Sequence, residues 1–391
     1  MNRVLITGGA GFIGSSLAIA LARRGWRVTV LDNLSPQIHG QDPSSSPLIV
    51  GLRGYADLVH GDVTDRPILA STLRDQDAVV HFAAETGTGQ SMYQIDRYTK
   101  VNIGGTSLLL DLLAGNKGSV KRLLVASSRS IYGEGKYCSK EVGIVYPLGR
   151  RAENMRAGNF EVTYPGCITP LTLLPTDEQS RIHPSSVYGI TKQFQEQMVM
   201  TVAPAIGIEG VALRYQNVYG PGQSLSNPYT GILSIFSNLI MQGRALNVFE
   251  DGQESRDFVF IDDVVEATVL ALEQPSAANE VFNVGSGTPT SILTVARELS
   301  RVIGKEVPIS VSGDFRIGDI RHNYACLDKA RRLLGYKPKV AFAEGIAEFA
   351  RWALDQGPRL SDYDRSLREM KDRGLLGHRA IPQSEFLQPT R

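Results

Sequence analysis

The chain has 391 residues, of which 42% are hydrophobic, and it contains 39 Gly and 19 Pro. A chain of this length can bury a large core, in one large domain or two closely joined ones. Its 41 Lys and Arg almost balance its 40 Asp and Glu. The net charge therefore produces no strong electrostatic field that would favour nucleic acid or an anionic membrane as a partner. An anionic ligand must instead be held by a local cluster of donors.

The three cysteines, Cys138, Cys167 and Cys326, are far apart and form no C-x-x-C pair. This spacing argues against a disulfide framework and a metal site, and it fits a reducing compartment. No run of 18 apolar residues occurs, and residues 1–7 lead straight into a glycine-rich turn rather than resembling a signal peptide. We therefore expect a cytoplasmic protein with no membrane segment.

Short apolar runs alternate with helical patterns through the first half of the chain. Strands are expected at Val4–Thr7, Arg27–Leu31, Asp57–His60, Ala78–Phe82, Arg122–Ala126 and Gly210–Arg214, and helices at Phe12–Arg23, Arg97–Leu113 and Ser185–Val202. This alternation predicts an α/β fold of the Rossmann type, with a doubly wound parallel sheet covered by helices on both faces.

The alternation of strand and helix patterns stops between residues 134 and 183, where Gly, Pro and charged residues occur without periodicity. A segment of this length is either a functional lid or a surface excursion. We expect residues 1–215 to form the dinucleotide-binding domain that contains this insertion, and residues 216–356 to form mainly a smaller mixed α/β substrate domain. The charged tail, residues 357–391, is either a helix that packs on a partner or a disordered segment.

A glycine-rich turn joins the first expected strand to the first helix. Gly8 permits the tight turn, Gly11 lets the backbone approach a pyrophosphate, and Gly14 allows close helix packing. Phosphates would then face the free N–H groups at the positive end of the helix. Asp32 ends the second strand, where its carboxylate can bind both ribose hydroxyls and would repel a 2′-phosphate. NAD is therefore favoured over NADP.

Three further residues carry the expected chemistry. Tyr188 and Lys192 lie four positions apart, on one face of a helix, and Ser128 follows the fifth strand, where open parallel sheets bind ligands. A phenol titrates near pH 10, and a neighbouring cation together with a positive nicotinamide ring lowers that pKa. Ser128 can hydrogen-bond the sugar oxygen undergoing oxidation. We expect these three residues to transfer a proton as hydride moves.

Together with Arg214–Pro221 and Arg256–Val259, these motifs resemble the extended short-chain dehydrogenase/reductase family of NAD-dependent sugar-nucleotide epimerases and dehydratases, over about residues 1–355. The resemblance implies bound NAD, a nucleotide-diphosphate sugar substrate and frequent homodimers. The implied cofactor contacts are Gly8, Gly11, Phe12, Ile13, Gly14, Asp32, Asn33, Asp62, Val63, Phe82, Ala83, Ala84, Asn102, Tyr188 and Lys192. The implied substrate contacts are Glu85, Ser91, Ser128, Arg129, Asn217, Val248, Arg256 and Arg316.

Arg129 and Ser130 stand where the 4,6-dehydratases of this family carry Asp-Glu, so the acid and base for water elimination are missing. The long insertion resembles that of the rhamnose-type 4-epimerases, although their expected C-x-x-C pair is reduced here to Cys167. Gln216 also replaces the usual aromatic residue. We therefore expect a nucleotide-sugar 4-epimerase. The alternatives are a keto-sugar-nucleotide oxidoreductase that exchanges NAD(H) at each turnover, and a non-catalytic dinucleotide sensor.

Overall fold

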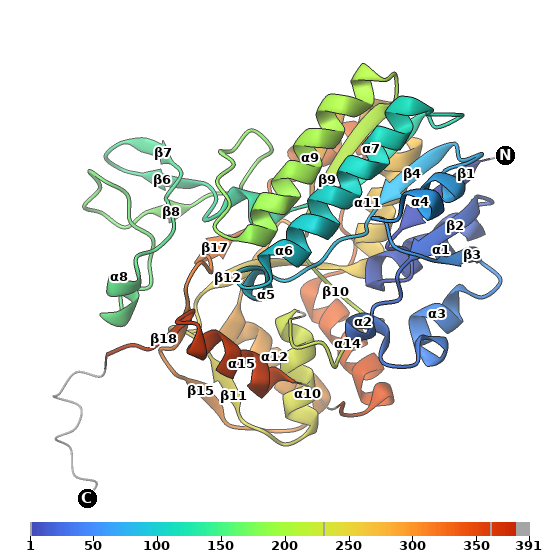
Figure 1. Ribbon diagram of the computed structural model, residues 1–391. Helices are drawn as coiled ribbons and strands as arrows, with labels where there is room; N and C mark the ends of the chain where they lie inside the picture. The colour runs from blue at the N-terminus through green and yellow to red at the C-terminus, as the bar shows by residue number, and fades with distance from the viewer. Residues whose placement is uncertain (1, 230, 360–361, 381–391) are drawn as a thin grey trace, which may run out of the picture.

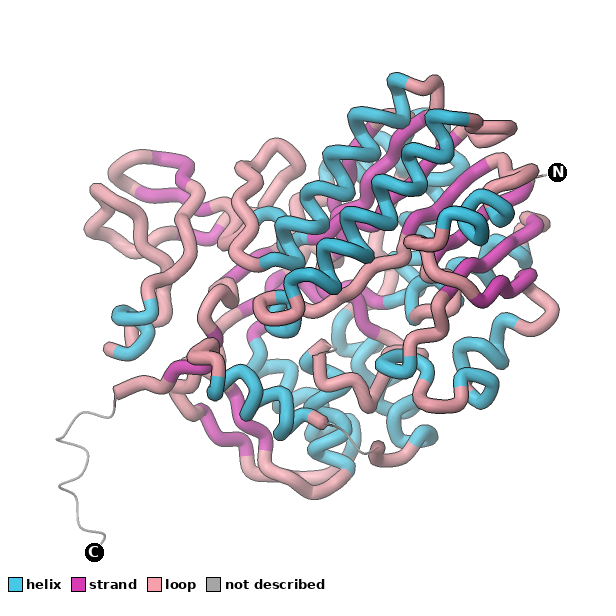
Figure 2. The backbone as a smooth tube through the Cα atoms, viewed as in Figure 1, coloured by secondary structure: helices cyan, strands magenta, loops and turns pink. Residues whose placement is uncertain are grey.

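The computed structural model describes residues 2–229, 231–359 and 362–380 (Figure 1). Within these ranges the chain forms a large α/β body, a smaller α/β unit beneath it, and an arm that projects to one side (Figures 1 and 2). No helix among the described residues is long and apolar enough to cross a membrane.

Seven parallel strands form the central sheet, in the order β13-β9-β5-β4-β1-β2-β3. Their bounds are β1 Arg3–Thr7, β2 Arg27–Asp32, β3 Ala56–His60, β4 Ala78–His81, β5 Arg122–Ser128, β9 Glu209–Tyr215 and β13 Glu280–Val284. The order of the strands reverses between β1 and β4, and a parallel sheet opens its ligand crevice at such a point. The expected Rossmann-type sheet is confirmed.

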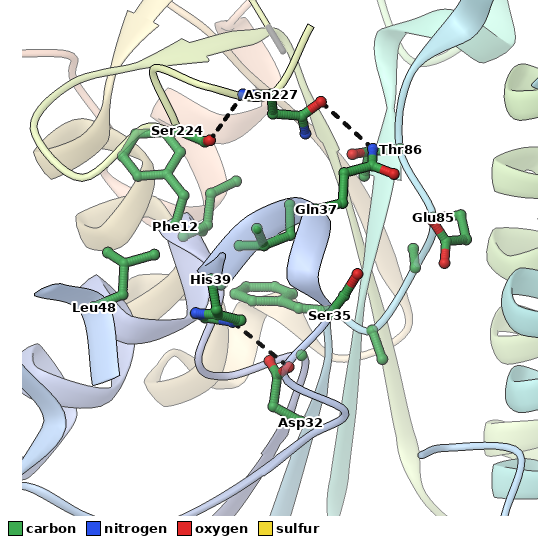
Figure 3. Close-up of a pocket in the computed structure, with 18 of the residues that line it drawn as sticks. Phe12, Asp32, Ser35, Gln37, His39, Leu48, Glu85, Thr86, Ser224 and Asn227 are labelled. Atoms are coloured by element: carbon green, nitrogen blue, oxygen red, sulfur yellow. Dashed lines mark hydrogen bonds and ion pairs between the residues drawn. The ribbon is translucent and has the colours of Figure 1, made fainter. Parts of the chain in front are cut away.

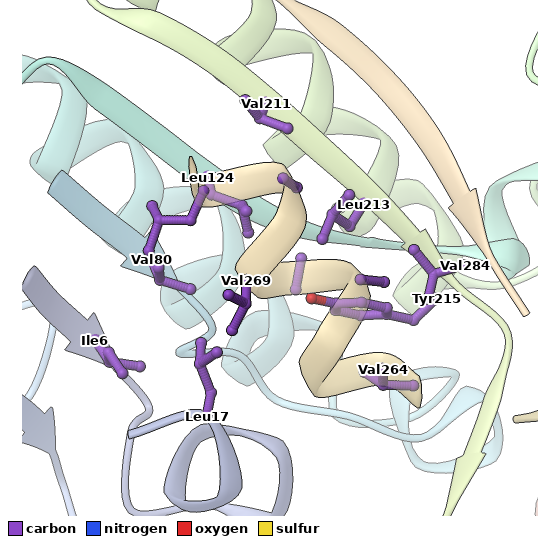
Figure 4. Packing of buried hydrophobic residues seen from close by; sticks show 14 of the residues in the cluster. Ile6, Leu17, Val80, Leu124, Val211, Leu213, Tyr215, Val264, Val269 and Val284 are labelled. Atoms are coloured by element: carbon purple, nitrogen blue, oxygen red, sulfur yellow. The ribbon is translucent and has the colours of Figure 1, made fainter. Parts of the chain in front are cut away.

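Helices cover both faces of this sheet. One face carries α1 (Phe12–Arg23), α11 (Ile261–Glu273) and α13 (Asp328–Leu334), and the other carries α4 (Arg66–Thr72), α7 (Gly105–Gly115) and α9 (Val187–Ala205). In Figure 4, Leu17 of α1 and Val269 of α11 point toward Val80 and Leu124 on the strands. All four side chains are buried on this face, and the alternate strand residues Val79 and Leu123 are buried on the other face against Leu109 of α7, so apolar side chains pack both faces of the sheet.

The predicted helix at residues 97–113 is a continuous run of α6 (Ile95–Tyr98), a π-helical turn η2 (Thr99–Gly104) and α7. Between β2 and β3 the chain makes an excursion that the periodicity did not predict. It contains α2 (Pro36–His39), the 3-10 turn η1 (Pro43–Ser45) and α3 (Pro47–Leu52). Each of these elements is too short for a 3.6-residue pattern to develop.

The smaller unit packs helices α10 (Ile232–Met241), α12 (Ile292–Ile303) and α14 (Phe342–Gln356) against short strands. These strands are β10 (Asn217–Tyr219), β12 (Ser255–Phe260), β14 (Pro289–Ser291) and β17 (His322–Asn323), with β11 (Leu246–Val248) and β15 (Ile309–Val311) paired separately. The chain does not stay in this unit after residue 215, because α11 and β13 return to the large sheet and the 3-10 turn η4 (Pro275–Ala277) joins them. The chain after residue 215 therefore forms most of the smaller unit and also contributes α11, α13 and β13 to the large body.

The insertion folds as an arm with a small core of its own. Strands β6 (Tyr137–Ser139), β7 (Gly143–Val145) and β8 (Thr172–Leu173) form a three-stranded sheet, and α8 (Ala152–Arg156) follows β7. Tyr137, Val145 and Val162 are buried against one another. The arm lies to the left of the main body in Figure 1.

The described part of the tail packs on its own chain. Helix α15 (Tyr363–Asp372) is followed by β18 (Leu376–Gly377), which pairs with β16 (Phe315–Arg316). The Glu369 carboxylate accepts hydrogen bonds from the hydroxyls of Tyr93 (3.0 Å) and Tyr229 (3.2 Å). Of the two expectations for the tail, a helix is correct for this part; residues 381–391 lie outside the described residues.

Arg321 joins the arm to the smaller unit. Its guanidinium is almost fully buried and donates to Glu161 of the arm (2.6 Å), to Glu250 (2.9 Å) and to Asp251 (2.7 Å). Glu250, Asp251 and Glu254 are close enough together to bind a cation, but this guanidinium already lies among them. The cluster is therefore a structural ion-pair network.

We predict that Arg321→Met lowers the free energy of unfolding by about 3–5 kcal/mol, because it leaves Asp251 without its counter-charge and the buried Glu250 with Arg150 alone. Chemical denaturation monitored by circular dichroism measures this change. Arg301→Met is the matched control, since the Arg301–Glu298 pair is exposed and contributes about 0–1 kcal/mol. Equal losses in both variants would contradict the network's role.

Candidate active site

The glycine turn has the geometry that a bound pyrophosphate requires. Gly8 has a φ of +67°, and a Cβ atom there would lie 2.6 Å from the Ala83 nitrogen. A Cβ atom on Gly14 would lie 2.5 Å from the Gly8 oxygen. Both positions therefore exclude side chains, and the backbone can approach a ligand at the start of α1.

Asp32 lies at the end of β2, on the wall of the same cavity (Figure 3). Its carboxylate accepts hydrogen bonds from the backbone N–H groups of Ala10 (3.0 Å) and Leu34 (2.9 Å). His39 lies 3.9 Å from it, but burial lowers the pKa of His39, although Asp32 opposes this shift. The imidazole is therefore neutral near pH 7 and adds no positive charge beside the Asp32 carboxylate.

The cavity has a volume of about 870 Å³ and runs from the glycine turn to the ends of β4 and β5. All the predicted cofactor contacts except Asn102 line it, which are Gly8, Gly11, Phe12, Ile13, Gly14, Asp32, Asn33, Asp62, Val63, Phe82, Ala83, Ala84, Tyr188 and Lys192. Asn33 donates to Asp62 (2.9 Å), so these two contacts support each other. A dinucleotide fits this donor set, and the assignment of individual contacts stays a prediction.

Ser128, Tyr188 and Lys192 meet at one end of the cavity. The Ser128 hydroxyl lowers the pKa of the nearby Tyr188 phenol, and it accepts hydrogen bonds from the backbone N–H (3.2 Å) and the hydroxyl (3.0 Å) of Ser130. The Lys192 ammonium donates to the Ala126 carbonyl (3.0 Å) and lies 6.0 Å from the centroid of the Tyr188 ring. The structure thus brings together the three side chains that the sequence analysis selected for catalysis.

Close packing places Tyr188 beside Ser128. Ser186 caps α9 by accepting a hydrogen bond from Gly189 N (3.1 Å), and Ser91 accepts one from Tyr188 N (3.0 Å). A Cβ atom on Gly189 would lie 2.7 Å from the Ser130 carbonyl oxygen, so only glycine lets the helix approach this closely. The start of α9 is therefore held against the end of β5.

Burial has the largest effect on the pKa values of the reacting groups. It raises the pKa of Tyr188, although the hydrogen bond from Ser128 and the charge of Arg129 oppose it. Burial also lowers the pKa of Lys192 to about 7. We expected the lysine to lower the pKa of the phenol. In the protein alone, however, loss of hydration dominates, and the groups that oppose it are Ser128 and Arg129 rather than Lys192.

The predicted substrate contacts occupy three different environments. Glu85 and Ser128 line the cavity. Arg129, Asn217, Arg256 and Arg316 are not among the residues that line the cavity. Arg129 donates to Asn217 (2.9 Å), and both Arg256 (2.9 Å) and Arg316 (3.1 Å) pair with Asp319. Ser91 and Val248 are fully buried.

Three of the predicted contacts hold other parts of the site in place. Ser91 supports the start of α9, and Val248 packs in the core of the smaller unit, with its backbone carbonyl bonded to Ser312 N (3.0 Å). Asn102 accepts a hydrogen bond from Glu85 N (2.7 Å) and donates to Thr191 (2.9 Å). The side chains of Ser91 and Val248 are turned away from the cavity, because strand and helix packing orients them inward.

A group of side-chain amides at the cavity wall was not predicted from the sequence. Gln37 donates to Gln90 (3.3 Å) and to Asn227 (3.4 Å), and both Gln37 and Asn227 line the cavity (Figure 3). These residues come from three segments, at positions 37, 90 and 227. No local motif marks them, because only the folded chain brings the segments together. The loop Ser224–Asn227 is a further part of the wall.

Known proteins resemble this chain over most of its length. Residues 4–151 and 163–285 match the NAD dependent epimerase/dehydratase family. A dTDP-L-rhamnose 4-epimerase of Burkholderia thailandensis is 40% identical over 358 residues, which cover 91% of this chain and 96% of the relative.

Solved structures agree with this match. The UDP-glucose 4-epimerase of Thermotoga maritima, solved with UDP-glucose, superposes with a TM-score of 0.73 and 30% identity over 90% of this chain and 99% of its own. The UDP-glucuronic acid 4-epimerase of Bacillus cereus, in complex with UDP-glucuronic acid and NAD, gives a TM-score of 0.73 and 26% identity over 90% of this chain and 99% of its own. The chain belongs to the NAD-dependent epimerase/dehydratase family.

Proposed function

We propose that the protein is an NAD-dependent nucleotide-sugar 4-epimerase. The observation that carries the proposal is that Ser128, Tyr188 and Lys192 line the same cavity as the glycine turn, with the Lys192 ammonium 6.0 Å from the Tyr188 ring. A proton acceptor and a dinucleotide site in one cavity suit the reversible oxidation of a secondary alcohol. The likeness to the rhamnose 4-epimerase points to a dTDP-linked 6-deoxyhexose as the first substrate to test.

In this mechanism the Tyr188 phenolate takes the proton of the C4 hydroxyl, and Ser128 aligns that hydroxyl. When bound, NAD would supply a reversible hydride acceptor for the oxidation at C4. Tyr188 would give the proton back after the 4-keto sugar has turned in the site, which inverts C4. Arg129 and Ser130 follow Ser128, so the carboxylic acids that water elimination needs are absent from those two positions.

We predict that Tyr188→Phe lowers kcat by at least about 100-fold, because it removes the general base. Binding of NAD, measured by calorimetry, should change little, since the glycine turn and Asp32 are untouched. Inversion at C4 of dTDP-L-rhamnose is the activity to measure. Turnover close to that of the wild type would overturn the assignment.

The amide bridge between Gln37 and Asn227 supports retention of the cofactor, because it links two walls of the cavity. We predict that the purified protein carries about one NAD per chain and consumes no added NADH during turnover, because an epimerase regenerates NAD in each cycle. Mass spectrometry of the denatured protein and absorbance assays measure these two quantities. Stoichiometric consumption of NADH would favour the net oxidoreductase instead.

We also propose that two copies pair through the outer face of α9. Ile190 and Phe194 lie four residues apart on this helix and are 41% and 46% exposed, and Ile95 on α6 is 53% exposed. Exposed apolar residues that share one helix face indicate an interface.

A cytoplasmic location stays a prediction of the sequence.

We predict that the double variant Ile190→Glu and Phe194→Glu is monomeric, because it places charge on the proposed interface. Sedimentation measures the mass. Ile168→Glu is the matched control: Ile168 is 94% exposed on the arm, far from α9 in the sequence, and its substitution should leave the dimer intact. A monomeric wild type, or a dimer that survives the double substitution, would contradict the proposal.

A further inference from the structure

The segment between β2 and β3 brings a histidine to the wall of the cavity. His39 is the last residue of α2, which ends at Gly40 with a φ of +78°. Helix α3 follows, and its Ile49 and Leu52 are buried in the core of the large body, which anchors the segment. His39 and Asp32 both line the cavity, and Figure 3 marks the contact between the imidazole and the carboxylate. The segment therefore holds His39 beside Asp32.

One nitrogen of this imidazole already has a partner. His39 Nδ1 lies 3.1 Å from the Ser46 hydroxyl, and both residues are buried. Ser46 stands at the N-cap position of α3, where a serine hydroxyl ordinarily binds a backbone N–H of the helix, but its side chain makes no capping bond. The Ser46 hydroxyl is directed to His39 instead, so it fixes the orientation of the imidazole.

The other nitrogen, Nε2, makes no hydrogen bond within the described part of the chain. It lies 3.9 Å from Asp32 Oδ1, which is too far for a direct hydrogen bond. The side chain of His39 is only 1% exposed, so bulk water hardly reaches this nitrogen. One oxygen atom between the two groups can lie about 2.8 Å from each of them. His39 Nε2 and Asp32 Oδ1 therefore frame a position for a single oxygen atom of a ligand.

The donors and acceptors at this position require a hydroxyl. Burial lowers the pKa of His39, so the imidazole is neutral at pH 7 and carries one N–H. The carboxylate of Asp32 favours that N–H on Nε2, while Nδ1 accepts from the Ser46 hydroxyl. Asp32 can only accept a hydrogen bond. The bridging oxygen must therefore accept from His39 and donate to Asp32, which a hydroxyl does and an ionised phosphate oxygen does not.

We propose that His39 is a specificity-determining residue of the cofactor site, which donates from Nε2 to one hydroxyl of the adenosine ribose while Asp32 accepts from the same hydroxyl. The end of the second strand is where a Rossmann-type sheet meets that ribose. A 2′-phosphate at this position would face the carboxylate without a counter-charge from His39. The inference concerns recognition of NAD and does not depend on which sugar the protein converts.

The test uses the protein with its bound NAD and measures selectivity. The holoprotein is equilibrated with mixtures of NAD and an NAD analogue that lacks the 2′- or the 3′-hydroxyl of the adenosine ribose. Mass spectrometry of the denatured protein gives the ratio of bound cofactors. The wild type should prefer NAD over one of the analogues by at least about 10-fold, because the analogue loses both hydrogen bonds. A merely structural role of His39 would affect NAD and the analogue equally and leave this ratio unchanged.

Two substitutions separate the two nitrogens of the imidazole. His39→Asn keeps a polar group near Ser46 but removes the donor at the ε position, and it should lower the preference for NAD by about 5-fold. His39→Gln places an amide N–H near the position of Nε2 and should keep the preference within about 2-fold of the wild type. His60→Asn is the matched control, because His60 is exposed at the end of the neighbouring strand β3 and does not line the cavity. Thermal melting shows whether each variant is folded.

Equal preferences in the wild type and in His39→Asn would overturn the inference, and so would a wild type that discriminates against neither analogue. A loss of preference in His39→Gln as large as that in His39→Asn would also overturn it, because the ε donor would not be the cause.

If His39→Asn does not fold, Ser46→Ala takes its place. This substitution frees the imidazole to turn, so it should lower the preference by about 2-fold, and an unchanged preference would count against the inference. The predicted selectivity in a protein that converts no nucleotide sugar would support the inference about His39 while refuting the proposed function.

Discussion

The site depends on ionising a phenol where burial opposes its ionisation. Tyr188 must lose a proton, yet loss of hydration raises its pKa and also removes charge from Lys192. Water must nevertheless be kept away, because hydride transfer to a dinucleotide needs a closed site. The protein has to stabilise the phenolate by other means, and the Ser128 hydroxyl and the charge of Arg129 both lower the pKa of Tyr188 against the effect of burial.

The fold makes this arrangement possible by bringing strand ends together. β1, β4 and β5 are neighbours in a parallel sheet, so the glycine turn, the backbone at Phe82–Ala84 and Ser128 all open on one edge. Helix α9 then carries Tyr188 and Lys192 on one face across the end of β5. Its close approach requires the missing side chain of Gly189. The position of the base is thus a consequence of backbone packing.

Local patterns predicted the parts of the molecule that depend on local chemistry. Six strands of the large sheet and the long helices α1 and α9 follow from their hydrophobic patterns, and the roles of Gly8 and Asp32 follow from their place at strand ends. The catalytic side chains were found because Tyr188 and Lys192 share a helix face. Where a residue's role depends on distant packing, prediction failed. Val248 is turned into the core of the smaller unit, and Gln37 reaches Asn227 from another segment.

The pairing of β13 with β9 in the large sheet could not be predicted from the sequence either, because the hydrophobic pattern of a strand does not reveal which sheet it joins. The arm lacks periodicity because its strands have only two or three residues each. It folds through its own small core and through Arg321, an ion-pair contact between segments that are far apart in the sequence.

The fate of the hydrogen on C4 tests the account most directly. A nucleotide sugar deuterated at C4 is incubated with the protein and an excess of free NAD, and the epimer is examined by mass spectrometry. The account predicts that the product keeps its deuterium at C4, because the same hydride leaves and returns within one bound complex. Deuterium found in the solvent or in the free NADH pool would contradict it.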